Sequence, residues 1–138
     1  IKNFINAFGE ELIIENAEKA LEQTLISHKS SIVDYTAAPF FMDNGNSGHH
    51  EWLIEFNDPP KDLIQFTTDL DDNLKKTNSD YKSKRFKNIT MSELEIKVAK
   101  KKLFYTWLKN KKKLGGQNKV PRLCNNRGLI EELLTISQ

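Results

Sequence analysis

Apolar and polar residues alternate in four stretches of the chain, a pattern typical of β-strands with one buried face. The first stretch spans Gly9, and glycine readily adopts the positive φ of a tight turn, so a short N-terminal hairpin is expected there. The other three stretches predict the main strands of a sheet, with the sequences SSIVDYTA (30–37), HHEWLIEFND (49–58) and SELEIKVAK (92–100).

The alternation also assigns faces to these strands. Within residues 49–58, Trp52, Ile54 and Phe56 fall on one face. Glu51 and Glu55 fall on the other, which suggests a half-buried strand. Within residues 92–100 the inward positions are Leu94, Ile96 and Val98.

Apolar residues at helical spacing predict two helices in the first half of the chain. Asn16 is a favourable N-cap for the first helix, which should continue to about Lys29. Asp58 followed by Pro59 is a favourable start for the second, which should end near Asn78.

The second half begins with a polar, basic stretch (79–88), expected to be a loop or irregular helix. A helix over 101–114 should end at Gly115, since glycine is a common C-terminal stop. Residues 119–124 should be extended, because the residue before a proline is disfavoured in helix. Asn125 or Asn126 then caps a last short helix.

This order of elements predicts a single α+β domain over residues 1–138. We expect a small mixed β-sheet of about three main strands plus the N-terminal hairpin, with helices packed mainly on one face. A chain of 138 residues can bury one core of ordinary size.

Composition places the chain among globular proteins: 38% of its residues are hydrophobic and 29% are charged. No apolar run approaches the roughly 20 residues of a membrane helix, so a membrane is not an expected partner. The single cysteine, Cys124, excludes an internal disulfide framework and favours the cytoplasm. The chain starts at Ile1 in what looks like folded sequence, so it is expected to be a piece of a longer protein.

Charge is distributed unevenly along the chain. Residues 1–69 carry 4 Lys/Arg and 12 Asp/Glu (net −8), whereas residues 70–138 carry 17 and 7 (net +10). A basic half is typical of proteins that bind nucleotides, nucleic acids or acidic surfaces. The alternative is that these lysines lie on solvated helix faces.

Motif searching excludes several kinds of site. His49 and His50 are adjacent, so on a strand they point to opposite faces, and no metal site is expected. Cys124 lacks a His and an acid at motif spacing, which makes it a weak nucleophile candidate. The chain has no glycine-rich phosphate loop. An RNA-recognition module would need exposed sheet aromatics that residues 92–100 do not supply, so nucleic acid is an unlikely partner.

The stretch LGGQNKVPRL (114–123) holds the remaining candidate, Lys119. Glycines precede this lysine and Pro121 follows it, so the loop can present its ammonium to a ligand beyond the domain surface. An ammonium can act as a point clamp on phosphate or carboxylate oxygens. The alternative is an ordinary solvent-exposed loop lysine.

Two motifs resemble a known family. INAFGEELIIENAEKAL (5–21) resembles the start of the C-terminal domain of acyl-adenylating enzymes, where a glycine-turn hairpin leads into the first helix. NKVPR (118–122) is similar to the lysine loop of the auxin-responsive Gretchen-Hagen-three family of acyl acid-amido synthetases. The order of elements between the two motifs is also similar, so the resemblance covers nearly the whole chain.

The resemblance implies that the chain is the mobile C-terminal cap domain of a larger ligase. A separate N-terminal domain would bind ATP with Mg and the acyl acid, and domain alternation would separate two half-reactions. In the first, the acid is activated as acyl-AMP, and in the second it is transferred to an amine such as an amino acid. The implied partners are that N-terminal domain and ATP or acyl-adenylate, and the isolated domain should be inactive.

The resemblance also assigns roles to individual residues. Lys119 matches the catalytic lysine of the family's cap domain, which supports adenylation. Gln117, Asn118 and Arg122 are expected to orient the loop or to contact the nucleotide. Gly9 is a turn close to the expected hinge.

Two other readings remain open from sequence. One is a stand-alone basic module that binds nucleic acid or protein, and the other is a structural or interaction domain.

Overall fold

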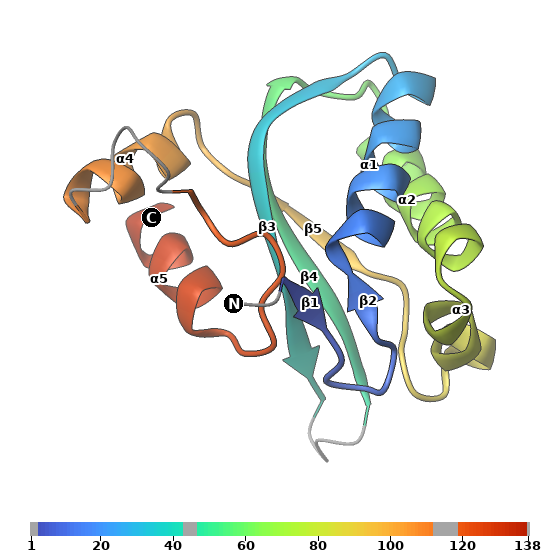
Figure 1. Cartoon of the computed structure of the whole chain (residues 1–138). Coiled ribbons are helices and arrows are strands. Elements are labelled where there is room, and N and C mark those ends of the chain that lie inside the picture. The colour runs from blue at the N-terminus through green and yellow to red at the C-terminus, as the bar shows by residue number, and fades with distance from the viewer. Residues whose placement is uncertain (1–2, 43–46, 112–118, 138) are drawn as a thin grey trace.

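The computed structural model describes residues 3–42, 47–111 and 119–137. A sheet in the middle of the molecule separates two groups of helices (Figure 1). The elements in chain order are β1 (Phe4–Ile5), β2 (Leu12–Ile13), α1 (Ile14–Ser27), β3 (Ser31–Phe41), β4 (Gly48–Asp58), α2 (Leu63–Thr77), α3 (Ser79–Arg85), the short 3₁₀ helix η1 (Phe86–Asn88), β5 (Glu95–Val98), α4 (Leu103–Asn110) and α5 (Gly128–Ser137).

The main sheet has the order β3-β4-β5 and is mixed, since β3 pairs with β4 antiparallel and β4 pairs with β5 parallel. A separate antiparallel hairpin is formed by β1 and β2. The prediction of an α+β domain with about three main strands plus an N-terminal hairpin is therefore confirmed. The two longest helices, α1 and α2, lie with α3 on one face, and α4 and α5 add a second, smaller layer on the other (Figure 1).

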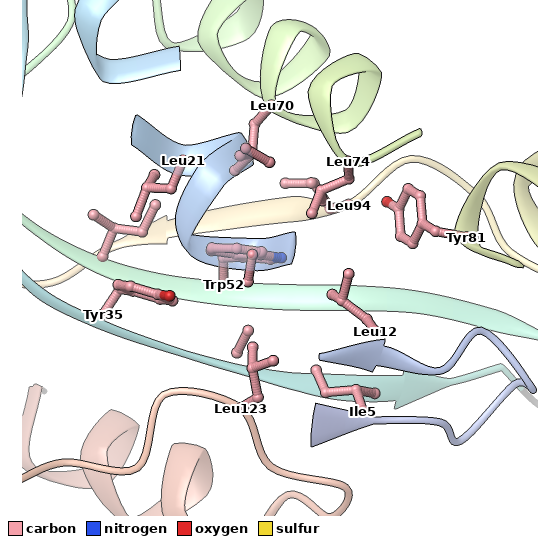
Figure 2. Packing of buried hydrophobic residues seen from close by; sticks show 14 of the residues in the cluster. Ile5, Leu12, Leu21, Tyr35, Trp52, Leu70, Leu74, Tyr81, Leu94 and Leu123 are labelled. Atoms are coloured by element: carbon pink, nitrogen blue, oxygen red, sulfur yellow. The ribbon is translucent and has the colours of Figure 1, made fainter. Parts of the chain in front are cut away.

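The larger core lies between the sheet, the hairpin and the helices α1 to α3. Trp52 of β4 stacks on Tyr35 of β3 with ring centroids 5.1 Å apart. Figure 2 shows Leu70 and Leu74 of α2 reaching toward this pair from one side, while Ile5 and Leu12 bring the hairpin into the same cluster. The apolar stripe predicted for the second helix is thus the buried face of α2.

The hairpin turns at Gly9, which has φ +85°. Glu10 follows it and is completely buried. One carboxylate oxygen of Glu10 accepts a hydrogen bond from the Phe8 amide at 2.7 Å, and the other contacts Nε2 of the buried His50 on β4. This buried pair attaches the hairpin to the main sheet.

Two predicted helix starts are wrong. Helix α1 begins at Ile14, so Asn16 lies inside its first turn, where it contacts the Asn78 side chain at 2.9 Å and the Thr77 carbonyl at 3.0 Å. The N-cap of α2 is Asp62, whose carboxylate accepts from the Gln65 amide at 3.0 Å. Strand β4 extends through Asp58, which moves the start of α2 beyond Pro59.

The prediction that Glu51 and Glu55 face solvent is also wrong, because their exposed fractions are 2% and 4%. The second helical layer covers their side of β4. Glu51 is paired with Arg127 at 2.6 Å and lies 3.6 Å from Lys97. Glu55 accepts hydrogen bonds from the amides of Lys102 (2.9 Å) and Phe104 (3.3 Å), at the start of α4.

Three predictions in the second half of the chain need correction or completion. Val98 of β5 is 55% exposed rather than inward. Helix α4 ends at Asn110, before Gly115, which lies outside the described residues. Helix α5 begins at Gly128, so Arg127 occupies the cap position instead of Asn125 or Asn126, although the Asn126 side chain accepts from the Gly128 amide at 3.0 Å. None of the helices in the described ranges is both long enough and apolar enough to span a membrane.

We predict that Glu55→Ala lowers the free energy of unfolding by about 1–3 kcal/mol, because two amides at the start of α4 lose their buried acceptor. Glu55→Gln keeps one acceptor oxygen and should cause a smaller loss. The exposed Glu22 serves as a matched control, and Glu22→Ala should change stability by less than about 0.5 kcal/mol. Urea unfolding measures all three, and equal effects of Glu55→Ala and Glu22→Ala would contradict the capping role.

Candidate functional site

Lys119 is exposed and begins an extended segment, residues 119–124, beside the outer edge of β3. The next residue, Val120, is only 4% exposed and belongs to the smaller core, which it shares with Leu53 of β4 and Phe104 of α4. The lysine therefore directly precedes a residue that is anchored in the protein interior.

Main-chain hydrogen bonds hold the rest of this segment against β3. The Ala37 amide donates to the Arg122 carbonyl at 2.8 Å, and the Cys124 amide donates to the Ala37 carbonyl at 3.0 Å. The Thr36 hydroxyl donates to the Pro121 carbonyl at 2.8 Å. The segment is non-helical as predicted, with a bend at Arg122 and a bridge to β3 at Leu123, and these bonds limit how far the backbone next to Lys119 can move.

The Arg122 side chain is engaged within the domain. Its guanidinium lies 2.5 Å from Glu18 on α1 and 3.3 Å from Asp34 on β3, and it covers the ring of Tyr35 at 5.1 Å. Burial lowers the pKa of Arg122, but Glu18 and Asp34 together raise it more, so the group stays cationic.

Burial also raises the pKa values of the two neighbours of Arg122, Tyr35 and Asp34. For Tyr35 the hydrogen bond that its hydroxyl donates to Glu18 adds to this effect. For Asp34 the nearby Arg122 opposes it. These contacts fit the loop-orienting alternative proposed for Arg122 better than direct contact with a nucleotide.

Asparagine side chains connect the segment to the N-terminal hairpin. Asn3 accepts from the Leu123 amide at 2.6 Å, while Asn6 and Asn125 exchange two hydrogen bonds of 2.8 and 2.9 Å. These contacts are not evident in the sequence because about 120 residues separate the partners. The only sequence signal was the occurrence of asparagines in both segments.

Three further residues were predicted for the site. Gln117 and Asn118 lie outside the described residues. Gly9 occupies a tight turn in which its amide donates to the Asn6 carbonyl at 3.0 Å. The turn favours glycine because of its positive φ; a Cβ at this position would lie 3.0 Å from the Lys84 side chain, whose flexible end can shift.

Among the described residues, no group of three His, Cys, Asp or Glu side chains is arranged so that it could hold a metal ion. His50 is bonded to Glu10, and His49 stacks on Phe40 with ring centroids 5.0 Å apart. What the segment offers chemically is one exposed ammonium on an anchored backbone.

Comparisons with known proteins agree with this architecture. The model of the GH3 family C-terminal domain matches residues 15–128. The solved structure of the GH3.15 acyl acid amido synthetase is similar over 99% of this chain, with a TM-score of 0.73 and 22% identity. The structure of AtGH3.15 acyl acid amido synthetase in complex with 2,4-DB is similar over the same share, with a TM-score of 0.72 and 19% identity.

The chain spans about a quarter of the length of these two solved structures, 25% and 26% respectively. No curated protein sequence matches it significantly.

We predict that Arg122→Ala loosens the segment that follows Lys119. Because the ion pairs are partly exposed, global stability should fall by only about 1 kcal/mol or less. Hydrogen exchange of the Ala37 and Cys124 amides should accelerate, since both amides form the hydrogen bonds that join the segment to β3. Arg122→Lys keeps the charge but cannot contact both acids and should show intermediate exchange. Unchanged exchange at these two amides would contradict the orienting role.

We also predict that Cys124 reacts slowly with alkylating reagents. Burial raises the pKa of its thiol, and a hydrogen bond with Thr36 offsets part of the shift. The thiolate is the reactive form, so the folded protein should need a higher pH for half-maximal reaction than the protein in urea. Iodoacetamide labelling across pH 7–10 measures this, and coincident folded and unfolded profiles would contradict it.

Proposed function

This chain belongs to the GH3 family C-terminal domain, and from that membership we propose that it is the mobile C-terminal domain of an ATP-dependent acyl-adenylating ligase. In the proposed reaction a carboxylate oxygen attacks the α-phosphorus of ATP, and the bond to pyrophosphate breaks. An amine such as an amino acid then attacks the acyl carbon, loses a proton and displaces AMP. ATP and the acid would be bound mainly by an N-terminal domain outside this chain.

Lys119 is the residue through which we propose that this domain contributes to adenylation. Negative charge is concentrated around the α-phosphate and the attacking carboxylate during adenylation. A positioned cation in a closed site stabilises that charge far better than a solvated one, because less water screens it. The anchoring of residues 120–124 supports this role, since a fixed backbone reduces the positions that the ammonium can sample.

We propose that the magnesium ion is bound by the rest of the enzyme and not by this chain. Magnesium would accompany ATP and neutralise part of the phosphate charge. The described residues offer no grouped ligands for it, so no step assigned to this chain depends on a metal ion. The proposed location of the parent enzyme is the cytoplasm.

The alternative of a stand-alone basic binding module is weaker. Of the Lys/Arg residues of the second half that the structure describes, six form ion pairs with acids of the same chain. These are Lys75, Arg85, Lys97, Lys111, Arg122 and Arg127. Their charge is partly neutralised inside the domain and is less available to a nucleic acid.

We predict that Lys119→Ala in the full-length enzyme reduces carboxylate-dependent exchange between ATP and pyrophosphate by about 10²–10³-fold. Thermal unfolding should hardly change, because the side chain is exposed. Lys101→Ala is the matched control, since Lys101 is another exposed lysine of the basic half, and it should keep full exchange.

Undiminished exchange in Lys119→Ala would remove this residue from the mechanism. Salt-sensitive binding of RNA or DNA by the wild-type chain, without any exchange activity in the enzyme, would instead favour the basic module.

A further inference from the structure

Strand β5 has an open edge. It lies at one end of the sheet order β3-β4-β5, and no other described strand pairs with its outer side. The Ala99 amide donates to the Ile54 carbonyl of β4 at 2.8 Å. Because main-chain groups alternate in direction along a strand, those of Ile96 and Val98 point away from β4. The edge can therefore accept another strand.

A groove runs beside this edge and has a volume of about 440 Å³. Its walls include Leu94 and Ile96 on one side and Leu63 and Ile64 of α2 on the other. Ile64 is 83% exposed, which is unusual for a large apolar side chain beside a sheet edge. The groove lies next to the unpaired main chain and mixes these apolar side chains with polar ones such as Ser92 and Glu93.

The sequence of this edge is complementary to itself. Leu94-Glu95-Ile96-Lys97-Val98 reads apolar, acidic, apolar, basic, apolar. If a second copy pairs antiparallel about a twofold axis at Ile96, each Glu95 lies opposite the other copy's Lys97. Ile96 lies opposite itself, while Leu94, which would lie opposite Val98, is already 3% exposed within the larger core. Opposite charges and apolar pairs at these positions stabilise a sheet.

The same register also provides hydrogen-bond partners for the outward main-chain groups of β5. In an antiparallel ladder, residues that face each other in a hydrogen-bonded pair exchange two bonds. Ile96 and Val98 are the strand residues whose main-chain groups are free, and this register uses both of them. A register shifted by one residue would put a side chain of one sheet face opposite a side chain of the other.

We propose that β5 is a self-docking edge through which two copies of this chain form a symmetric dimer with a continuous six-stranded sheet. Glu95 has no ion-pair partner among the described residues, and Lys97 remains 46% exposed despite its contact with Glu51, so both charges are available. An edge with charges of one sign would repel its own copy, whereas this one attracts it. The groove then receives part of the second copy's edge.

The test uses the full polypeptide that carries these residues and measures its mass by sedimentation velocity. Wild type should dimerise between about 1 and 100 µM, the range typical of small interfaces. Glu95→Lys creates two like-charge pairs and should weaken association about tenfold or more. Lys97→Glu should do the same. An equal mixture of the two variants restores both attractive pairs and should form a heterodimer.

A second variant covers the possibility that Lys97→Glu disturbs folding through the nearby Glu51. Val98→Pro removes an outward amide at a mostly exposed position, so the fold should persist and the dimer should be lost. A monomeric wild type at about 100 µM would overturn the proposal. Slow hydrogen exchange of the Ile96 and Val98 amides in such a monomer would point to another segment on the edge. A dimer insensitive to all these variants would also overturn it.

Discussion

Strand β4 is covered on both faces, and much of the domain depends on how its polar side chains are satisfied. A carboxylate removed from water is costly unless it is paired or hydrogen-bonded. Glu55 meets this requirement with two amides at the start of α4, and Glu51 meets it with Arg127, which directly precedes α5. The same bonds that satisfy β4 therefore attach the second helical layer to it.

This attachment determines where the candidate lysine can lie. Residues 111–127 connect α4 with α5, so both ends of the connection are fixed relative to β4. Within it, Val120 enters the smaller core and the next four residues bond to β3 or to the hairpin. Lys119 thus combines an exposed charge with an anchored backbone, which is a favourable combination for an electrostatic role.

Sequence patterns predicted the kind and order of the elements well and their faces less well. The alternation around Trp52 and the stripe of α2 were correct because both depend on one face of an element. The same alternation misplaced Glu51 and Glu55, since a charged residue on a strand normally faces water. Nothing local to β4 shows that α4 and α5 will cover its second face. Asn16 and Asp58 were assigned as caps for a similar reason, because a favourable cap residue does not show that the helix begins there.

By itself the sequence determined the fold class, the hairpin turn at Gly9 and the family, because these depend on local periodicity, on backbone preference and on short motifs. It also singled out Lys119 through the loop that surrounds it. Only the tertiary structure decided that Arg122 is bound to Glu18 and Asp34, and that Glu10 is buried against His50. It also decided that no second described strand pairs with the outer edge of β5. These features join residues far apart in the chain, and their energies depend on burial and distance, which a linear pattern does not contain.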